Sequence, residues 1–458
     1  MDNKKRIIII AGAAIFLIVL IVIGVLVFGN KGGNTQQKPI DNSIDCTKNP
    51  ENEACKKINI DKNKEVGLTI WGVYDDNTSF QEALKSFNKI YPNIKITYLK
   101  KQYADYEQIL VDAIASDSAP DIFAMENTWL PKHKAKISPA PNSVISSEEF
   151  SEKFTSAAYD DFVTDNKVYA LPAYMDNLML YYNKKIFNDN YIYDIPETWG
   201  EVLAISQKLT KKSSSGQISQ SGISLGTSNN ISRANDILLA MMIQTNTPII
   251  SQDKKSFTFN QFRKDESNQP YYPGENALKY YTNFADPSSS AYSWDSSLEN
   301  NVASFAHGNV AMMVGYNYFA NQIATINPKL SYGTANFPQI DINKKDQQAT
   351  LANYWGYTVS RNSKNSGYAW LFLNYLLNGE GLDSYLQATG KTSALNKVTS
   401  GNIINQQKGI TKTIYKGNGI KFDTIFNEMI DDVSKYKQKP LTALDTANRK
   451  ANEIILAE

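Results

Sequence analysis

Short segments between Val66 and Met125 alternate between apolar runs and amphipathic stretches, and this alternation constrains the fold more than any other feature of the chain. The apolar runs are Leu68–Val73, Ile94–Leu99 and Asp121–Met125, and the amphipathic stretches begin at Ser79 and Tyr103. Ser79 and Glu82 have the spacing of a capping box, and Pro92 ends the first helical pattern. Strand–helix–strand units of this kind predict an α/β fold with a parallel sheet and right-handed crossovers.

Polar and aromatic side chains follow the predicted strands at the points where they end. Trp71, Tyr74 and Asp75 lie at the end of the first strand, and Glu126 and Asn127 follow the third. Ligands of parallel sheets gather beyond the carboxyl ends of the strands. These residues are therefore candidate ligand-binding residues.

The segment Val168–Lys185 is predicted to pass from one packed unit to another. It contains two strand-like runs separated by Pro172, and proline does not fit inside a central strand. A chain of 458 residues is also too long for one ordinary core, so two or three packed units are expected. Tyr174 and Asp176 lie beside this crossing, where a ligand cleft is expected.

The N-terminus carries the pattern of a membrane anchor. Ile7–Phe28 contains no charged residue, and at about 1.5 Å per residue it is long enough for the hydrocarbon layer of about 30 Å. Lys4, Lys5 and Arg6 precede it, which predicts that residues 1–6 are cytoplasmic and that the rest of the chain is extracytoplasmic. A cleavable signal peptide is the alternative, but the apolar run is long for one and no A-x-A-like site follows.

Residues 29–65 are predicted to be a flexible linker because they are rich in Gly, Asn, Gln and Lys. Cys46 and Cys55, the two cysteines of the chain, lie in it. On the extracytoplasmic side they could form a disulfide, with free or intermolecular thiols as the alternative.

Composition excludes several functional classes. The formal net charge is +1, from 47 basic and 46 acidic residues, and no basic patch interleaves with the aromatic residues, so no nucleic-acid partner is expected. The chain has 27 tyrosines but only 2 histidines, which argues against a zinc site. Tyr181 and Tyr182 could suggest a ferric site, but neighbouring residues of a strand point to opposite faces. We expect no metal and no cofactor.

One motif suggests an enzyme. Gly222–Gly226 has the G-x-S-x-G pattern around Ser224, and acids such as Asp286 precede His307. A nucleophile of this class needs a strand before the serine and a helix after it, whereas the flanking sequence is polar and loop-like. We therefore expect the protein not to be an enzyme, and a serine hydrolase remains a minor alternative.

Six motifs in order carry a resemblance to a known family. They are L-T-I-W-G, A-P-D-I, L-P-A-Y-M-D-N-L-M-L-Y-Y-N-K, P-E-T-W-G-E-V-L, F-A-H-G-N-V-A-M-M-V-G-Y and A-T-G-K-T-S-A-L. Together they resemble the extracellular solute-binding proteins of ABC importers, in the sugar-binding, maltose-binding-protein-like branch. The resemblance covers residues 66–458.

The resemblance implies a two-lobed α/β fold of the periplasmic-binding-protein type, whose lobes are joined by a hinge and which here follows an N-terminal transmembrane helix. Lobe one is expected to comprise residues 66–173 and 295–338, and lobe two residues 174–294 and 347–458. The implied function is capture of a small solute by hinge closure, without chemical change, and delivery to an importer permease. We expect a monomer held at the cell membrane. A surface receptor or adhesin that uses the same fold is the alternative.

The chemistry of a sugar site then selects candidates along the chain. A sugar ring presents an apolar face and a rim of hydroxyls, so its site needs flat aromatic surfaces and planar polar groups. Candidate platforms are Trp71, Tyr74, Tyr174, Tyr316, Tyr318 and Trp355, and candidate rim partners are Asp75, Glu126, Asn127, Asp176, Asn230 and Asn353. Core packing is an equal alternative for Trp71 and Trp355, and a hinge salt bridge or helix cap is the alternative for Asp176. The sequence leaves saccharides, polyols and peptides open as solutes.

Overall fold

The computed structural model describes residues 60–61, 63–377, 379–396 and 403–456. The predicted transmembrane segment Ile7–Phe28 and the candidate disulfide Cys46–Cys55 lie outside these residues. Among the helices that the structure does describe, none combines the length and the apolar character needed to cross a membrane.

The first sheet confirms the α/β prediction. Its strands are β1 (Val66–Gly72), β2 (Ile94–Lys100), β3 (Ile122–Glu126), β4 (Ile137–Ser138), β7 (Leu171–Pro172) and β16 (Trp355–Ser360). The order is β2-β1-β3-β16-β4, with β7 also pairing with β16. β1 runs parallel to β2 and β3, whereas β16 is antiparallel to β3. The carboxyl end of β3 therefore meets the amino end of β16, which places Glu126 opposite Trp355.

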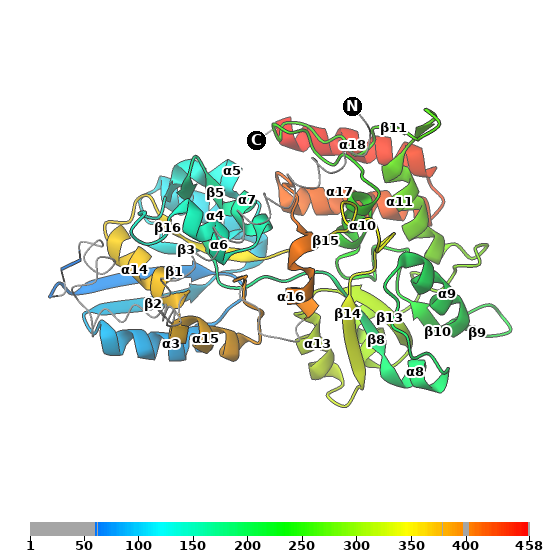
Figure 1. Cartoon of the computed structure of the whole chain (residues 1–458), viewed down its shortest axis with the longest axis horizontal. Helices are drawn as coiled ribbons and strands as arrows, with labels where there is room; N and C mark the ends of the chain where they lie inside the picture. The colour runs from blue at the N-terminus through cyan, green and yellow to red at the C-terminus, as the bar shows by residue number, and fades with distance from the viewer. Residues whose placement is uncertain (1–59, 62, 378, 397–402, 457–458) are drawn as a thin grey trace, which may run out of the picture. The chain divides into compact units, whose positions relative to one another are not determined.

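Helices cover both faces of this sheet (Figure 1). They include α3 (Asn77–Ile90), α4 (Tyr103–Ala115), α5 (Leu130–His133), α6 (Ser147–Lys153), α7 (Ser156–Phe162), α14 (Ser366–Leu376) and α15 (Gly379–Thr389). The first helix begins earlier than predicted. Asp76, not Ser79, is its N-cap, because the Asp76 carboxylate accepts the backbone N–H of Ser79 at 3.0 Å. The helix ends at Ile90, before Pro92, as predicted.

The second sheet has five strands in the order β14-β8-β13-β10-β9. They are β8 (Met179–Asn183), β9 (Lys211–Lys212), β10 (Ile218–Ile223), β13 (Val310–Gly315) and β14 (Tyr332–Asn336). The helices packed with this sheet and around it are α8 (Lys184–Asp189), α9 (Trp199–Leu209), α10 (Ala234–Gln244), α11 (Pro273–Thr282), α12 (Asn301–Ala306), α13 (Phe319–Ile326), α16 (Ile403–Gln407), α17 (Gly419–Ser434) and α18 (Pro440–Leu456). α17 and α18 lie side by side at the end of the chain (Figure 1).

Two separate hydrophobic cores define the lobes, and they correct the predicted boundaries. Residues 66–175 and 352–394 share one core, and residues 178–351 and 404–451 share the other. The prediction that residues 295–338 return to lobe one is wrong, because β13 lies between β8 and β10 in the second sheet. The returning strand is instead β16, which we had assigned to lobe two. We call residues 66–175 and 352–396 lobe one, and residues 176–351 and 403–456 lobe two.

The lobes meet at a hinge built from backbone hydrogen bonds between distant segments. Asn353 N donates to Asp176 O at 3.0 Å, and Leu178 N donates to Leu351 O at 3.0 Å. The short strands β15 (Thr350–Leu351) and β17 (Thr411–Lys412) run parallel beside them. The first crossing lies between Met175 and Asp176, slightly later than the predicted position at Pro172–Tyr174.

Candidate functional site

An aromatic cluster in lobe one lies where β1 ends and β16 begins. Trp355 is buried at its base, and its ring lies 5.6 Å from that of Tyr74 and 5.1 Å from that of Trp129. Tyr74 and Tyr103 stack on each other with ring centres 6.0 Å apart. These two tyrosines are 53% and 38% exposed, so they offer open ring surface while Trp355 supports them from below.

Lobe two contributes a second aromatic pair. The rings of Tyr316 and Tyr318 stack at 6.0 Å with an angle of 13° between their planes. Tyr316 is buried and its hydroxyl donates to Asp236 Oδ2 at 2.9 Å, whereas Tyr318 is 44% exposed. Tyr316 is therefore the support and Tyr318 the accessible surface.

The two aromatic groups lie near each other across the lobes. Desolvation of its hydroxyl raises the pKa of Tyr74. The neighbouring Tyr103 and Glu126 also act to raise this pKa, whereas Arg233 of lobe two acts to lower it. Tyr318 of lobe two also acts to raise the pKa of Tyr74, so the two tyrosines lie near each other. We call Tyr74, Tyr103 and Trp355 of lobe one, with Tyr316 and Tyr318 of lobe two, the aromatic site. Its lobe-one part lies beyond the carboxyl end of β1.

Glu126 and Asn353 border the aromatic site beside the hinge. Asn353 Nδ2 donates to Glu126 Oε1 at 3.2 Å, and Thr128 Oγ1 donates to Oε2 at 3.4 Å. Glu126 is buried at the end of β3, and burial raises the pKa of its carboxyl. A Cβ atom at Gly419, the first residue of α17, would lie 3.8 Å from Glu126 Oε2. Lobe two therefore closely approaches Glu126.

Asp176 links the hinge to the exposed tyrosine of lobe two. Its carboxylate accepts the backbone N–H of Asn317 at 2.7 Å and that of Tyr318 at 3.1 Å. Burial raises the pKa of Asp176 to about 7, although these amides act to lower it. The carboxylate thus caps the turn that leads into α13, which is the cap alternative that the sequence left open.

A network of four charged residues in lobe two was missed by the sequence analysis. Lys416 Nζ lies 2.8 Å from Asp236 Oδ1 and 2.6 Å from Asp423 Oδ1, and Arg233 Nε donates to Asp236 Oδ2 at 2.8 Å. Burial acts to raise the pKa of Asp236, but Arg233 and Lys416 hold it well below its usual range. Arg233 and Lys416 lie far apart in the sequence. The backbone of Arg233 is left-handed, with φ of 65°, and no sequence pattern predicts this conformation.

Asp75 and Tyr174 support the site rather than open to it. Asp75 Oδ1 lies 2.5 Å from Lys391 Nζ, and Asp75 Oδ2 accepts the hydroxyls of Tyr357 at 2.8 Å and Tyr385 at 2.9 Å. Lys391 Nζ lies 3.9 Å from the centre of the Tyr174 ring. Both residues are buried, and both carboxylate oxygens of Asp75 are occupied. The prediction that Asp75 is a free rim partner is therefore wrong.

Asn230 is a second correction. Its Nδ2 donates to the carbonyls of Asp295 and Leu298 at 2.9 Å, and its Oδ1 accepts from Thr227 at 2.5 Å and from Trp294 at 3.0 Å. The amide is thus saturated inside lobe two and stabilises the loop that contains residues 227–230. Its predicted role as a ligand partner is not compatible with these contacts.

Trp71 lies apart from the ring cluster of Trp355. Its ring is half-buried, and Lys101 Nζ lies 3.9 Å from its centre. None of the ring pairs among the described residues joins Trp71 to Tyr74, Tyr103 or Trp355. The structure therefore favours the packing alternative for Trp71, while Trp355 combines burial with contact to exposed tyrosines.

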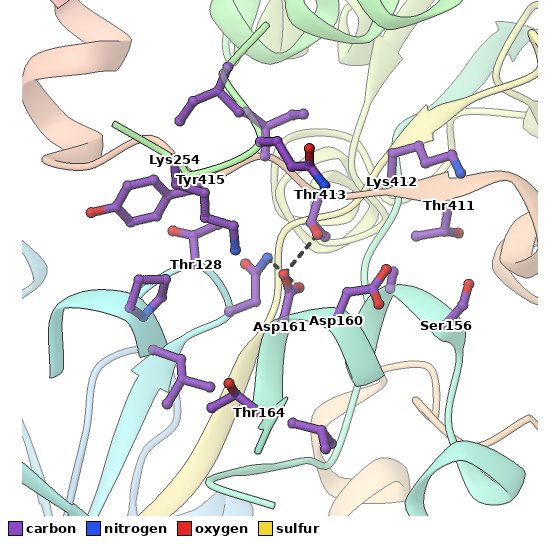
Figure 2. A pocket seen from close by; sticks show the side chains of 18 of the residues that line it. Thr128, Ser156, Asp160, Asp161, Thr164, Lys254, Thr411, Lys412, Thr413 and Tyr415 are labelled. Carbon is purple, nitrogen blue, oxygen red and sulfur yellow. Dashed lines mark hydrogen bonds between the residues drawn. The ribbon is translucent and has the colours of Figure 1, made fainter. Parts of the chain in front are cut away.

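Asn127 faces a different space between the lobes. A cavity of about 850 Å³ is lined by residues 127–134 and 156–164 of lobe one and by residues 250–254 and 411–415 of lobe two. Figure 2 shows Asp161 of lobe one and Thr413 of lobe two joined across it by a hydrogen bond of 2.9 Å. Asn127 Nδ2 and Tyr354 Oη also donate to Asp161, at 3.0 Å and 2.6 Å. Burial raises the pKa of Asp161 to about 6.

The residues of the hydrolase motif do not assemble. Ser224 is fully buried, and His307 Nδ1 lies 2.9 Å from Glu299 rather than near a serine. Trp199 and Trp370 are buried in the cores. No group of three or more metal-ligating side chains occurs within residues 60–61, 63–377, 379–396 and 403–456.

Comparisons with known proteins agree with this architecture. The family model for bacterial extracellular solute-binding proteins matches residues 71–381. A candidate binding protein of Brucella abortus is 24% identical over 330 residues, covering 71% of this chain and 75% of that protein. A diacetylchitobiose-binding protein of Streptomyces coelicolor is 28% identical over 161 residues, covering 32% of this chain and 37% of that one.

Solved structures show the same fold. The sugar-binding protein MalE of Xanthomonas citri aligns with a TM-score of 0.69 at 16% identity, covering 85% of this chain and 98% of that one. An ABC substrate-binding protein of Listeria monocytogenes in complex with cycloalternan gives a TM-score of 0.66 at 18% identity, covering 85% and 99%. With a two-lobed fold, a hinge and a family model that matches more than half of its length, the chain belongs to the bacterial extracellular solute-binding proteins.

Proposed function

We propose that the protein is the substrate-binding component of an ABC importer and that it captures a carbohydrate between its lobes without changing it. The observation that carries this proposal is the aromatic site, where exposed tyrosines of both lobes lie near each other beside the hinge. Structural neighbours bound to carbohydrates, such as cycloalternan, support the choice of solute class.

The aromatic site matches the two surfaces of a sugar ring. Tyr74 and Tyr318 supply flat apolar surface for the C–H face of the ring, and Asn353 and Glu126 supply planar polar groups for its hydroxyls. A neutral hydrogen bond contributes about 0.5–1.5 kcal/mol, and one to a charged group about 1.5–3 kcal/mol. A few such bonds together with stacking are sufficient for micromolar affinity, which corresponds to about 8 kcal/mol.

Closure of the lobes follows from the division of the site between them. A solute that contacts both groups of tyrosines binds the closed form more tightly than the open form, so it shifts the population toward closure. Periplasmic binding proteins are the standard example of such hinge closure. The hinge at Asp176, Leu351 and Asn353 is where the rotation would occur.

The N-terminal sequence extends the proposal to the cell surface. We infer that Ile7–Phe28 anchors the protein in the cell membrane, that residues 1–6 are cytoplasmic and that residues 29–65 tether the binding domain outside. The partner would be an importer permease, and the binding protein would act as a monomer. A disulfide between Cys46 and Cys55 is part of the same proposal.

A thermal-shift screen of the full chain in detergent against carbohydrates, polyols and peptides tests the proposed function. A ligand at a hundredfold excess over its Kd adds about 2.7 kcal/mol of stability. We expect saccharides to raise the melting temperature, and the recovered saccharide to be chemically unchanged. Stabilisation by peptides alone, or a saccharide that is cleaved, would contradict the proposal.

A further inference from the structure

Two carboxylates beside the aromatic site form no direct ion pair among the described residues. Glu126 is buried and Asp176 half-buried, and neither belongs to any ion pair among the described residues. The partners of Glu126 are the Asn353 amide and the Thr128 hydroxyl, and those of Asp176 are backbone amides. Lys416 and Arg233 act on Glu126, and Lys391 acts on Asp176, but none of these cations forms a direct ion pair with either acid.

Other buried acids of the same region are compensated. Asp75 pairs with Lys391 at 2.5 Å, and Asp236 pairs with Arg233 and with Lys416. A buried charge without a partner is costly, because burial removes its hydration. Burial raises the pKa of Glu126 and raises that of Asp176 to about 7, which is the effect expected of carboxylates that lack a nearby uncommitted cation.

The cations near these two acids already form ion pairs with other carboxylates of the protein. Lys391 is bound to Asp75, and Arg233 and Lys416 are bound to Asp236 and Asp423. An anionic solute would have to compete for them with buried carboxylates of the protein. A cationic solute would meet two carboxylates that form no direct ion pair among the described residues.

Each of the two carboxylates lies near one of the exposed rings. Glu126 acts to raise the pKa of Tyr74, and Asp176 acts to raise the pKa of Tyr318. Asn353 connects the two acids, since its side chain donates to Glu126 and its backbone N–H donates to the carbonyl of Asp176. Aromatic faces also attract cations, so the tyrosines and the carboxylates favour the same kind of ligand group.

We infer that the preferred solute is an amino sugar, a saccharide with a protonated amine that lies beside Glu126 and Asp176. This inference rests on the proposed function and specifies the ligand class of the same site. The ring would stack on the exposed tyrosines, and the ammonium group would compensate the two carboxylates. An acidic sugar would be excluded.

Isothermal titration calorimetry of the full chain in detergent at pH 6.5 tests this with matched ligands. The probes are glucosamine, glucose, N-acetylglucosamine and glucuronate, and the corresponding β-1,4-linked disaccharides. We expect the amine to bind at least about tenfold more tightly than the hydroxyl and N-acetyl forms, and the acid to show no binding.

Glu126→Gln keeps the size of the side chain and the hydrogen bond from Asn353 but removes the charge. In this variant the amine should lose at least about fivefold more affinity than glucose or its disaccharide loses, because only the amine interacts with the charge that is removed. Asp160→Asn is the control, because Asp160 is an exposed acid that lines the cavity beside Asp161, away from the aromatic site. It should change none of these affinities.

The outcomes separate the two proposals. If neutral saccharides bind as tightly as the amines, or if Glu126→Gln weakens both equally, the amino-sugar inference is wrong and carbohydrate capture stands. If no saccharide binds in calorimetry or in the thermal-shift screen, both proposals are wrong. A preference for amines that survives Glu126→Gln would also overturn the assignment to this carboxylate.

Discussion

Asp176, at the crossing between the lobes, accepts the backbone N–H of Tyr318, the exposed tyrosine of lobe two, at 3.1 Å. The residue that marks the hinge thus fixes the position of an aromatic surface. Any rotation at the hinge will be transmitted to Tyr318 through this contact and through the adjacent bond to Asn317. The hinge segment is therefore hydrogen-bonded directly to the segment that carries the exposed tyrosine of lobe two.

Replacing Tyr318 with Ala should weaken saccharide binding by at least about tenfold, because stacking and apolar contact are lost from one side of the aromatic site. The free energy of unfolding should change by less than about 1 kcal/mol, since the ring is 44% exposed. Tyr193→Ala is the control, because Tyr193 is 74% exposed in another part of lobe two. Calorimetry and urea unfolding measure the two effects. Unchanged affinity in Tyr318→Ala would remove this residue from the site.

Trp355 and Trp370 allow packing and binding to be separated. Both are buried in lobe one, so replacing either with Ala should lower the free energy of unfolding by about 3–5 kcal/mol. Only Trp355→Ala should also weaken binding, because Trp355 supports Tyr74 and Tyr103. Calorimetry below the melting temperature of both variants distinguishes them. Equal affinity loss in the two variants would mean that Trp355 acts through stability alone.

Lys416 should be essential for the stability of lobe two. Lys416→Met leaves Asp236 with one cation instead of two and leaves Asp423 without its closest partner. Because breaking a buried ion pair costs about 3–5 kcal/mol, we expect a loss of about 3 kcal/mol in urea unfolding. Lys412→Met is the control, since Lys412 is exposed and forms no ion pair among the described residues. A loss below about 1 kcal/mol in Lys416→Met would show that the network contributes little.

The stability of the protein should depend on pH through Asp161. Burial raises its pKa from 3.8 in the unfolded chain to about 6. Its contribution is therefore fully present below about pH 4 and is lost as the pH rises through 6, because the buried charged form is disfavoured. At pH 4 we expect Asp161→Asn to be less stable than the parent, and this difference in stability should become smaller by pH 8. Melting temperatures at both values measure this. A constant difference across that range would contradict the elevated pKa.

The hydrogen bond between Thr413 and Asp161 joins the lobes at the cavity that both lobes line. Thr413→Val should cost about 1 kcal/mol of stability and change saccharide affinity by a few-fold, because the bond belongs to one arrangement of the lobes. Thr164→Val is the control, as Thr164 lines the same cavity from lobe one alone. Parallel behaviour of the two variants in calorimetry would show that this bond is not coupled to closure.

Local sequence patterns predicted those features that depend on neighbours in the chain. The strands and helices between Val66 and Met125 follow from the periodicity of apolar residues. The lobe to which β13 and β16 belong does not follow from them, because both are buried apolar strands and only tertiary pairing decides.

The site shows the same division. Glu126, Tyr318 and Trp355 could be proposed because they end strands or accompany family motifs, whereas the charged network joins Arg233 to Lys416 across a long stretch of chain. Asp75 and Asn230 looked available because a sequence does not show which partners fold onto them. Their saturation by Lys391, by hydroxyls and by loop carbonyls is a property of the folded chain alone.

A crystal structure of the full chain saturated with the saccharide that most stabilises it tests the central claim most directly. The account predicts a chemically intact sugar ring between Tyr74 and Tyr318, with both lobes in contact with it. A saccharide bound outside the aromatic site, for example in the cavity beside Asp161, or one held by a single lobe, would contradict it.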